Sequence, residues 1–142
     1  MSGFLVPSGL TEGARKPGGG RRVLVVDDDE LNRQLCILQL ADAGFIVETA
    51  SSAEMALRAV RASRPDVILS DVQMPGMDGF TLRRVIRGDA SLSGIPVVLI
   101  STARREDPLG SSAGRDEACI LRTPELREAI DALLNALQRS AH

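Results

Sequence analysis

The sequence predicts an α/β fold in which helices cover both faces of a parallel sheet. Short apolar runs alternate five times with segments of helical periodicity. The runs are continuously apolar, which is typical of strands buried on both faces. At 142 residues the chain is long enough for one domain with an ordinary core. We therefore expect a doubly wound sheet whose strands are joined by right-handed crossovers.

The chain begins with a segment rich in glycine and proline. Residues 1–20 include Pro7, Pro17 and three consecutive glycines, and they predict a flexible tail before a domain over residues 21–142. The glycines precede the first apolar run instead of following it. They are therefore not a phosphate-binding loop of the kind found after a strand.

The first strand is predicted at residues 23–26, and it leads into three consecutive aspartates. Asp29 is the expected cap of the next helix, and Gly44 is expected to end it. The spacing i, i+4, i+7 predicts that one stripe of this helix is buried. That stripe consists of Leu31, Leu35 and Leu38.

The next two units repeat this pattern. Ser51 and Glu54 predict a capping box at the start of the second helix, and Asp78 is expected to cap the third. The predicted ranges are a strand at 45–49, a helix from 52 to about 63, a strand at 66–71 and a helix at 80–87.

The last part of the chain predicts two more strands, at 96–101 and 118–121, and a final helix after Pro124. Residues 104–117 are rich in glycine and serine, so we expect an irregular or shortened fourth helix there. Five such units favour the flavodoxin-like strand order 2-1-3-4-5, with a ligand site where the order reverses.

Composition excludes several classes of function. The net charge is −2 and aromatic residues make up 2% of the chain, so we expect no binding to nucleic acid. The only histidine is His142, which rules out catalysis by Ser-His-Asp or Cys-His groups. Without a signal peptide or a long apolar run, we expect a cytoplasmic protein that does not enter membranes. The side chains of Cys36 and Cys119 are expected to be buried, as small apolar groups are.

Acidic residues follow two strands that are expected to be neighbours. Asp27, Asp28 and Asp29 follow the first strand, and Asp71 ends the third. Carboxylates this close repel one another unless a cation joins them. Mg²⁺ is the best fit, since it takes carboxylates, water and phosphate oxygens as ligands. Thr102 would add a hydroxyl at the end of the fourth strand.

Three motifs resemble the receiver domain of two-component response regulators. They are Val-Leu-Val-Val-Asp-Asp-Asp at 23–29, Ser-Asp-Val-Gln-Met-Pro-Gly-Met-Asp-Gly at 70–79 and Ser-Thr-Ala at 101–103. The resemblance extends over about residues 21–140. It implies a phosphoacceptor domain that receives a phosphoryl group from a sensor histidine kinase or a histidine phosphotransfer protein.

The resemblance also implies a role for each matching residue. Asp71 matches the phosphoacceptor and a metal ligand. Asp27, Asp28 and the backbone carbonyl of Gln73 match the other Mg²⁺ ligands. Thr102 matches the hydroxyl residue that moves toward the phosphoryl group. The enzymatic activity implied is at most self-phosphorylation and slow autodephosphorylation at the acceptor, for which an ordinary ionised carboxylate is sufficient.

One matching residue is missing, because receivers carry a lysine followed by proline after the fifth strand. The only lysine here is Lys16, in the predicted tail. If the prolines are aligned, Thr123 occupies the lysine position; if the register shifts by one, Arg122 does. Arginine keeps the charge but presents a planar fork in place of a point charge. The aromatic residue that often precedes the lysine is replaced by Ile120.

The sequence leaves alternative functions open. The leading hypothesis is a stand-alone receiver that signals by contact with an unknown protein, as a single-domain regulator or phosphorelay intermediate. A second is a degenerate receiver that binds a protein independently of phosphorylation. A third, a hydrolase of the haloacid dehalogenase type, fits Asp27–Asp29 superficially but lacks the later lysine which that family needs.

Overall fold

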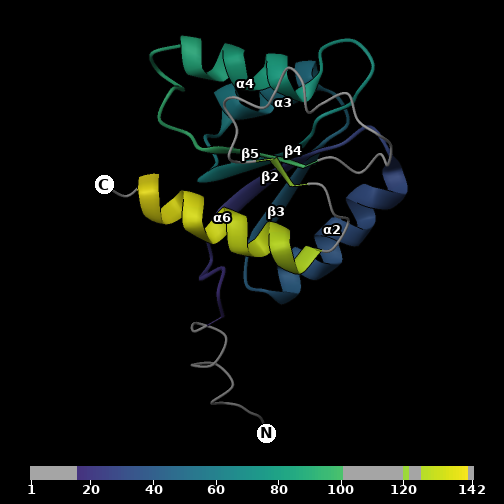
Figure 1. Cartoon of the computed structure of the whole chain (residues 1–142), viewed down its shortest axis with the longest axis vertical. Helices are drawn as coiled ribbons and strands as arrows, with labels where there is room; N and C mark the ends of the chain where they lie inside the picture. Colours follow the sequence, from purple (N-terminus) through teal and green to yellow (C-terminus); the bar gives the residue numbers. More distant parts are fainter. Residues whose placement is uncertain (1–15, 101–119, 122–125, 141–142) are drawn as a thin grey trace, which may run out of the picture.

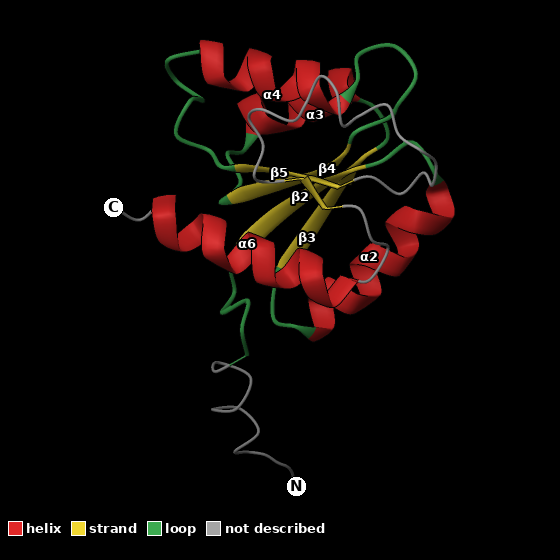
Figure 2. Cartoon of the chain, viewed as in Figure 1, coloured by secondary structure: helices red, strands yellow, loops and turns green. Residues whose placement is uncertain are grey.

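The computed structural model describes residues 16–100, 120–121 and 126–140. These residues form a central parallel sheet between two layers of helices (Figures 1 and 2). Helices α3 (Ala53–Ala62) and α4 (Gly79–Gly88) cover one face, and α2 (Glu30–Asp42) and α6 (Leu126–Ser140) cover the other. None of these helices is long and apolar enough to cross a membrane. The predicted flavodoxin-like α/β fold is confirmed, whereas the irregular or shortened fourth helix predicted at residues 104–117 lies outside the described residues.

The sheet has the predicted strand order. Its strands are β2 (Arg22–Val26), β3 (Ile46–Ala50), β4 (Val67–Asp71), β5 (Val97–Ile100) and β6 (Ile120–Leu121). They lie side by side as β3-β2-β4-β5-β6, and every pairing is parallel. This is the order 2-1-3-4-5 expected from the sequence. Of the predicted fifth strand, the structure describes the two residues that pair with Leu99 and Ile100.

Each central strand is buried on both faces, as continuous apolar runs predict. In β2, Leu24 and Val26 pack in the core beneath α3 and α4, whereas Val23 and Val25 pack toward α2 and α6. All five residues of β4 are buried. The buried carboxylate of Asp71 therefore stands at the end of a strand that is otherwise apolar, apart from Ser70.

Side-chain caps fix where three helices begin. The carboxylate of Asp29 accepts a hydrogen bond from the backbone N–H of Asn32 at 2.9 Å, and Asp78 accepts one from Thr81 at 2.9 Å. Both caps were predicted. The predicted cap at Ser51 is wrong by one residue. The capping hydroxyl is that of Ser52, which accepts a hydrogen bond from the backbone N–H of Met55 at 3.1 Å.

The predicted buried stripe of α2 is also wrong. Leu31, Leu35 and Leu38 are 65%, 45% and 66% exposed. The helix instead packs through Cys36, Leu40 and Ala43, of which Leu40 is fully buried. Both stripes have the spacing i, i+4, i+7, so periodicity alone does not distinguish them. The stripe with two small residues faces the sheet.

A turn at residues 16–20 joins the start of the described chain to the end of α2. The N–H of Gly18 donates to the carbonyl of Ala43 at 2.7 Å, and that of Gly20 donates to Gly44 at 2.8 Å. A Cβ on Gly18 would lie 2.5 Å from the backbone nitrogen of Phe45, so only glycine fits. The last five residues of the predicted tail therefore form a turn, and the rest of it lies outside the described residues.

Candidate functional site

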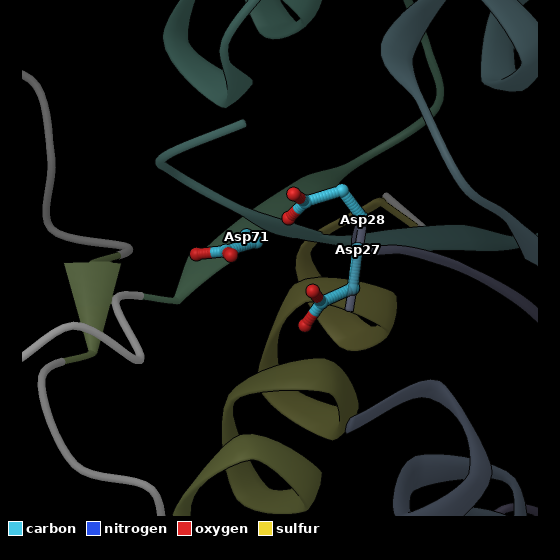
Figure 3. Close-up of side chains that lie close together, drawn as sticks. All are labelled: Asp27, Asp28 and Asp71. Carbon is cyan, nitrogen blue, oxygen red and sulfur yellow. The ribbon is translucent and has the colours of Figure 1, made fainter. Parts of the chain in front are cut away.

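The carboxyl ends of β2 and β4 bring three carboxylates together. The two strands are paired side by side, with Val26 opposite Ser70. Asp27 and Asp28 follow β2, and Asp71 ends β4 (Figure 3). One carboxylate oxygen from each of these residues lies within 4.8 Å of the others. This oxygen cluster has the donor type that Mg²⁺ prefers, so the residues present fit a magnesium ion.

The backbone after each strand orients two of the acids. The carboxylate of Asp27 accepts a hydrogen bond from the N–H of Asp29 at 2.9 Å, and the guanidinium of Arg33 donates to the Asp27 carbonyl at 2.7 Å. The N–H of Gln73 lies 3.4 Å from a carboxylate oxygen of Asp71. Asp27 is therefore held by both its side chain and its carbonyl, whereas the bond from Gln73 to Asp71 is longer.

Burial and mutual repulsion make these acids unusual. Asp27 and Asp71 are 4% and 5% exposed. Burial, and next the negative charge of Asp27, raise the pKa of Asp71 from 3.8 to about 6, against the hydrogen bond from Gln73. Burial likewise raises the pKa of Asp27. From the sequence we expected an ordinary ionised carboxylate at Asp71, and the raised pKa differs from that expectation. A cation among these groups would oppose the shift by favouring the charged forms.

The loop after Asp71 is packed closely against the end of β4. Met74 is buried, and the N–H of Gly79 donates to the carbonyl of Val72 at 2.9 Å. A Cβ on Gly79 would collide with the carbonyl oxygen of Asp71. Gly76 has a φ of 78°, in the left-handed region that favours glycine. The glycines of this loop thus allow α4 to begin directly beside the acidic site.

Comparison with known protein families agrees with this geometry. The response regulator receiver domain matches residues 23–118, a range that includes all three acids. The chain belongs to this family.

Two proteins of similar sequence are response regulators. It is 37% identical to the DNA-binding response regulator MtrA of Mycolicibacterium smegmatis, over 68% of this chain and 42% of MtrA. It is 46% identical to the response regulator PleD of Caulobacter vibrioides, over 56% of this chain and 18% of PleD. The chain thus matches less than half the length of these two relatives.

Solved receiver structures share its fold. The chemotaxis protein CheY4 of Vibrio cholerae is 33% identical, with a TM-score of 0.67 over 85% of this chain and 98% of CheY4. A putative response regulator from Chloroflexus aurantiacus is 30% identical, with a TM-score of 0.75 over 84% of this chain and 99% of that one.

The structure places some of the predicted site residues and leaves others undescribed. Asp27, Asp28 and Asp71 lie together, and Gln73 contacts Asp71 through its N–H. The predicted Gln73 carbonyl ligand stays a prediction. Thr102, Arg122 and Thr123 lie outside the described residues, so their predicted roles are untested.

Sequence reasoning missed the contribution of α2 to this site. A cavity of about 230 Å³ adjoins the acids, and its walls include Leu35 and Cys36 of α2 besides Asp27 and Asp71. Burial, and next the charge of Asp27, raise the pKa of the Cys36 thiol to about 11, so it stays protonated at neutral pH. The signal that could have pointed to α2 is its start three residues after Asp27, which places its first turns beside the acids.

Proposed function

We propose that this receiver domain accepts a phosphoryl group on Asp71 from a histidine kinase or a histidine phosphotransfer protein. The observation that carries the proposal is the meeting of three carboxylates at the ends of β2 and β4, with Asp71 almost fully buried. In the proposed cytoplasmic setting, the phosphorylated domain signals by contact with another protein, as a single-domain regulator or as an intermediate in a phosphorelay.

The proposed reaction is a displacement at phosphorus. A carboxylate oxygen of Asp71 forms a bond to the phosphorus atom while the bond from phosphorus to the donor's imidazole nitrogen breaks. Most of the catalysis is positioning and charge neutralisation. Mg²⁺, when bound, would supply positive charge beside the phosphoryl oxygens. Asp27, Asp28 and Asp71 would hold it, and Asp27 is oriented for this by the N–H of Asp29.

Further residues complete the proposal; of these, Gln73 is described, whereas Thr102, Arg122 and Thr123 are not. The carbonyl of Gln73 is the proposed further metal ligand. The hydroxyl of Thr102 is the proposed partner of a phosphoryl oxygen. Either Arg122 or Thr123 takes the place of the usual lysine, and neither offers its compact ammonium group.

The test is incubation of the purified chain with Mg²⁺ and acetyl phosphate, followed by intact mass spectrometry. We expect one phosphoryl adduct, absent from Asp71→Asn and from samples containing EDTA. Asp42→Asn is the matched control, since Asp42 is an exposed carboxylate at the end of α2. An adduct that persists in Asp71→Asn would refute the assignment of the acceptor.

The missing lysine favours one alternative, a receiver that binds its partner without phosphorylation. The sole lysine of the chain is Lys16, in the turn beside the end of α2 and therefore not in the acidic cluster. This alternative predicts no adduct from acetyl phosphate or from purified histidine phosphotransfer proteins. It also predicts that Asp71→Asn binds a partner protein as tightly as the unchanged chain does.

A further inference from the structure

Helix α2 exposes an apolar surface that has no partner among the described residues. Leu31, Leu35 and Leu38 occupy positions i, i+4 and i+7, so their side chains adjoin on one side of the helix. We call these three residues the leucine strip. The opposite side of α2 packs on the sheet through Leu40. A contiguous strip of large exposed apolar side chains is typical of a surface that binds another segment or molecule.

The N-terminal segment starts beside this helix. The turn at residues 16–20 is hydrogen-bonded to Ala43 and Gly44, just past the last turn of α2. The side chain of Lys16 reaches the same place, because a Cβ added at Gly44 would lie 2.7 Å from its Cβ. Residues 1–15 are therefore tethered to the end of the helix that carries the leucine strip.

The length of this segment matches the length of the strip. With a rise of about 1.5 Å per residue, Leu38 lies about 6 Å and Leu31 about 17 Å from the end of α2. An extended chain spans about 3.3 Å per residue, so Leu10 can reach about 20 Å from Lys16 and Phe4 about 40 Å. The span of the segment therefore exceeds the length of the leucine strip, and its apolar residues can reach all three leucines.

The composition of the segment suits the same surface. It contains the apolar run Phe4-Leu5-Val6, followed by Leu10. It ends in Arg15, next to Lys16, and the last turn of α2 has no basic residue while it includes Asp42. A short tether gives an effective concentration on the order of millimolar, which lets a weak apolar contact form within the chain.

We propose that residues 1–15 fold back along α2 and cover the leucine strip with their apolar side chains. Leu35 belongs to the strip and also lines the cavity beside Asp27 and Asp71. The covering segment therefore lies next to the acidic site.

The contact is tested by methyl NMR of leucine-labelled protein. The full chain is compared with a variant lacking residues 2–15 and with the full-length variant Phe4→Ser, Leu5→Ser, Leu10→Ser. We expect the methyl resonances of the leucine strip to shift in both variants. Those of Leu82 should not shift, because Leu82 is fully buried on the other side of the sheet. Glu12→Gln is the matched polar control and should leave every leucine resonance in place.

Identical spectra of the strip in the full and shortened chains would overturn the proposal. Resonances of the strip that depend on protein concentration, equally in both chains, would also overturn it and identify a second copy as the occupant. Acetyl phosphate labelling should proceed at the same rate in both chains. If neither chain forms an adduct, the proposed phosphoacceptor function fails, while the methyl spectra still decide whether the segment covers α2.

Discussion

Replacing Asp71 with asparagine should stabilise the metal-free fold at neutral and alkaline pH. In the folded chain, burial and the charge of Asp27 raise the pKa of Asp71 from 3.8 to about 6. The ionised carboxylate is therefore less favourable in the fold than in the unfolded chain. Asparagine has a similar shape, keeps an oxygen that can accept from the N–H of Gln73, and removes the charge.

The sign and size of the effect follow from the two pKa values. Below pH 3.8 the carboxyl is protonated in both the folded and the unfolded chain, so it does not lower the free energy of unfolding. Above about pH 6 it is ionised in both, and the free energy of unfolding is lowered by the full amount. A pKa raised from 3.8 to about 6 corresponds to about 3 kcal/mol, at 1.36 kcal/mol per pH unit. With relaxation around the charge, we expect Asp71→Asn to gain about 1–3 kcal/mol at pH 8.

Urea unfolding in EDTA, followed by circular dichroism between pH 4 and pH 8, measures this gain. Circular dichroism is the suitable probe because the chain has no Trp or Tyr. The gain should shrink as the pH falls from about 6 toward 4, and Asp42→Asn is measured beside it as the control for replacing an exposed carboxylate. Adding Mg²⁺ should stabilise the unchanged chain more than the variant. An Asp71→Asn variant that is no more stable than the unchanged chain at pH 8 would refute the electrostatic reasoning.

Three further substitutions test other parts of the structure. Ser52→Ala should cost about 1 kcal/mol in urea unfolding, because it removes a helix cap, and Ser51→Ala should cost less; equal costs would contradict the assigned cap. Gly79→Ala should destabilise the fold and reduce the phosphoryl adduct, because a Cβ there meets the end of β4. Gly88→Ala meets nothing within 4 Å and should be neutral or stabilising by up to about 1 kcal/mol. Thr123→Lys should slow loss of the adduct, measured by mass spectrometry over time, since a charged hydrogen bond contributes about 1–3 kcal/mol; an unchanged lifetime would show that the lysine position lies elsewhere.

The strands and the acidic site were predictable because strong local signals determined them. A continuous apolar run ending in aspartate predicts a buried strand with an acid at its exit, and this holds for Asp27 and Asp71. Their proximity follows from the strand order, which the alternation of strands and helices predicts. The raised pKa of Asp71 was not predictable, because it depends on burial and on the distance to Asp27.

The orientation of α2 could not be predicted from its sequence for a different reason. The helix carries two apolar stripes of equal spacing, and large leucines favour the wrong one if hydrophobicity alone is considered. Packing against the sheet depends also on how closely the helix can approach, and this favours the stripe with Cys36 and Ala43. The cap at Ser52 was missed similarly, since two adjacent serines are equivalent in composition and only backbone geometry distinguishes them.

In the proposed function, the residues that receive the phosphoryl group and those that respond to it follow different pairs of strands. All three carboxylates belong to the ends of β2 and β4, which pair with each other through four residues. The residues proposed to respond, Thr102 and Arg122 or Thr123, follow β5 and β6. The absence of the usual lysine therefore leaves the proposed acceptor and the proposed metal ligands in place, while the responding side loses a compact ammonium group. If Thr123 occupies the lysine position, that positive charge is absent, and neutralisation of the phosphoryl group should depend more on the metal ion than in a receiver that keeps its lysine.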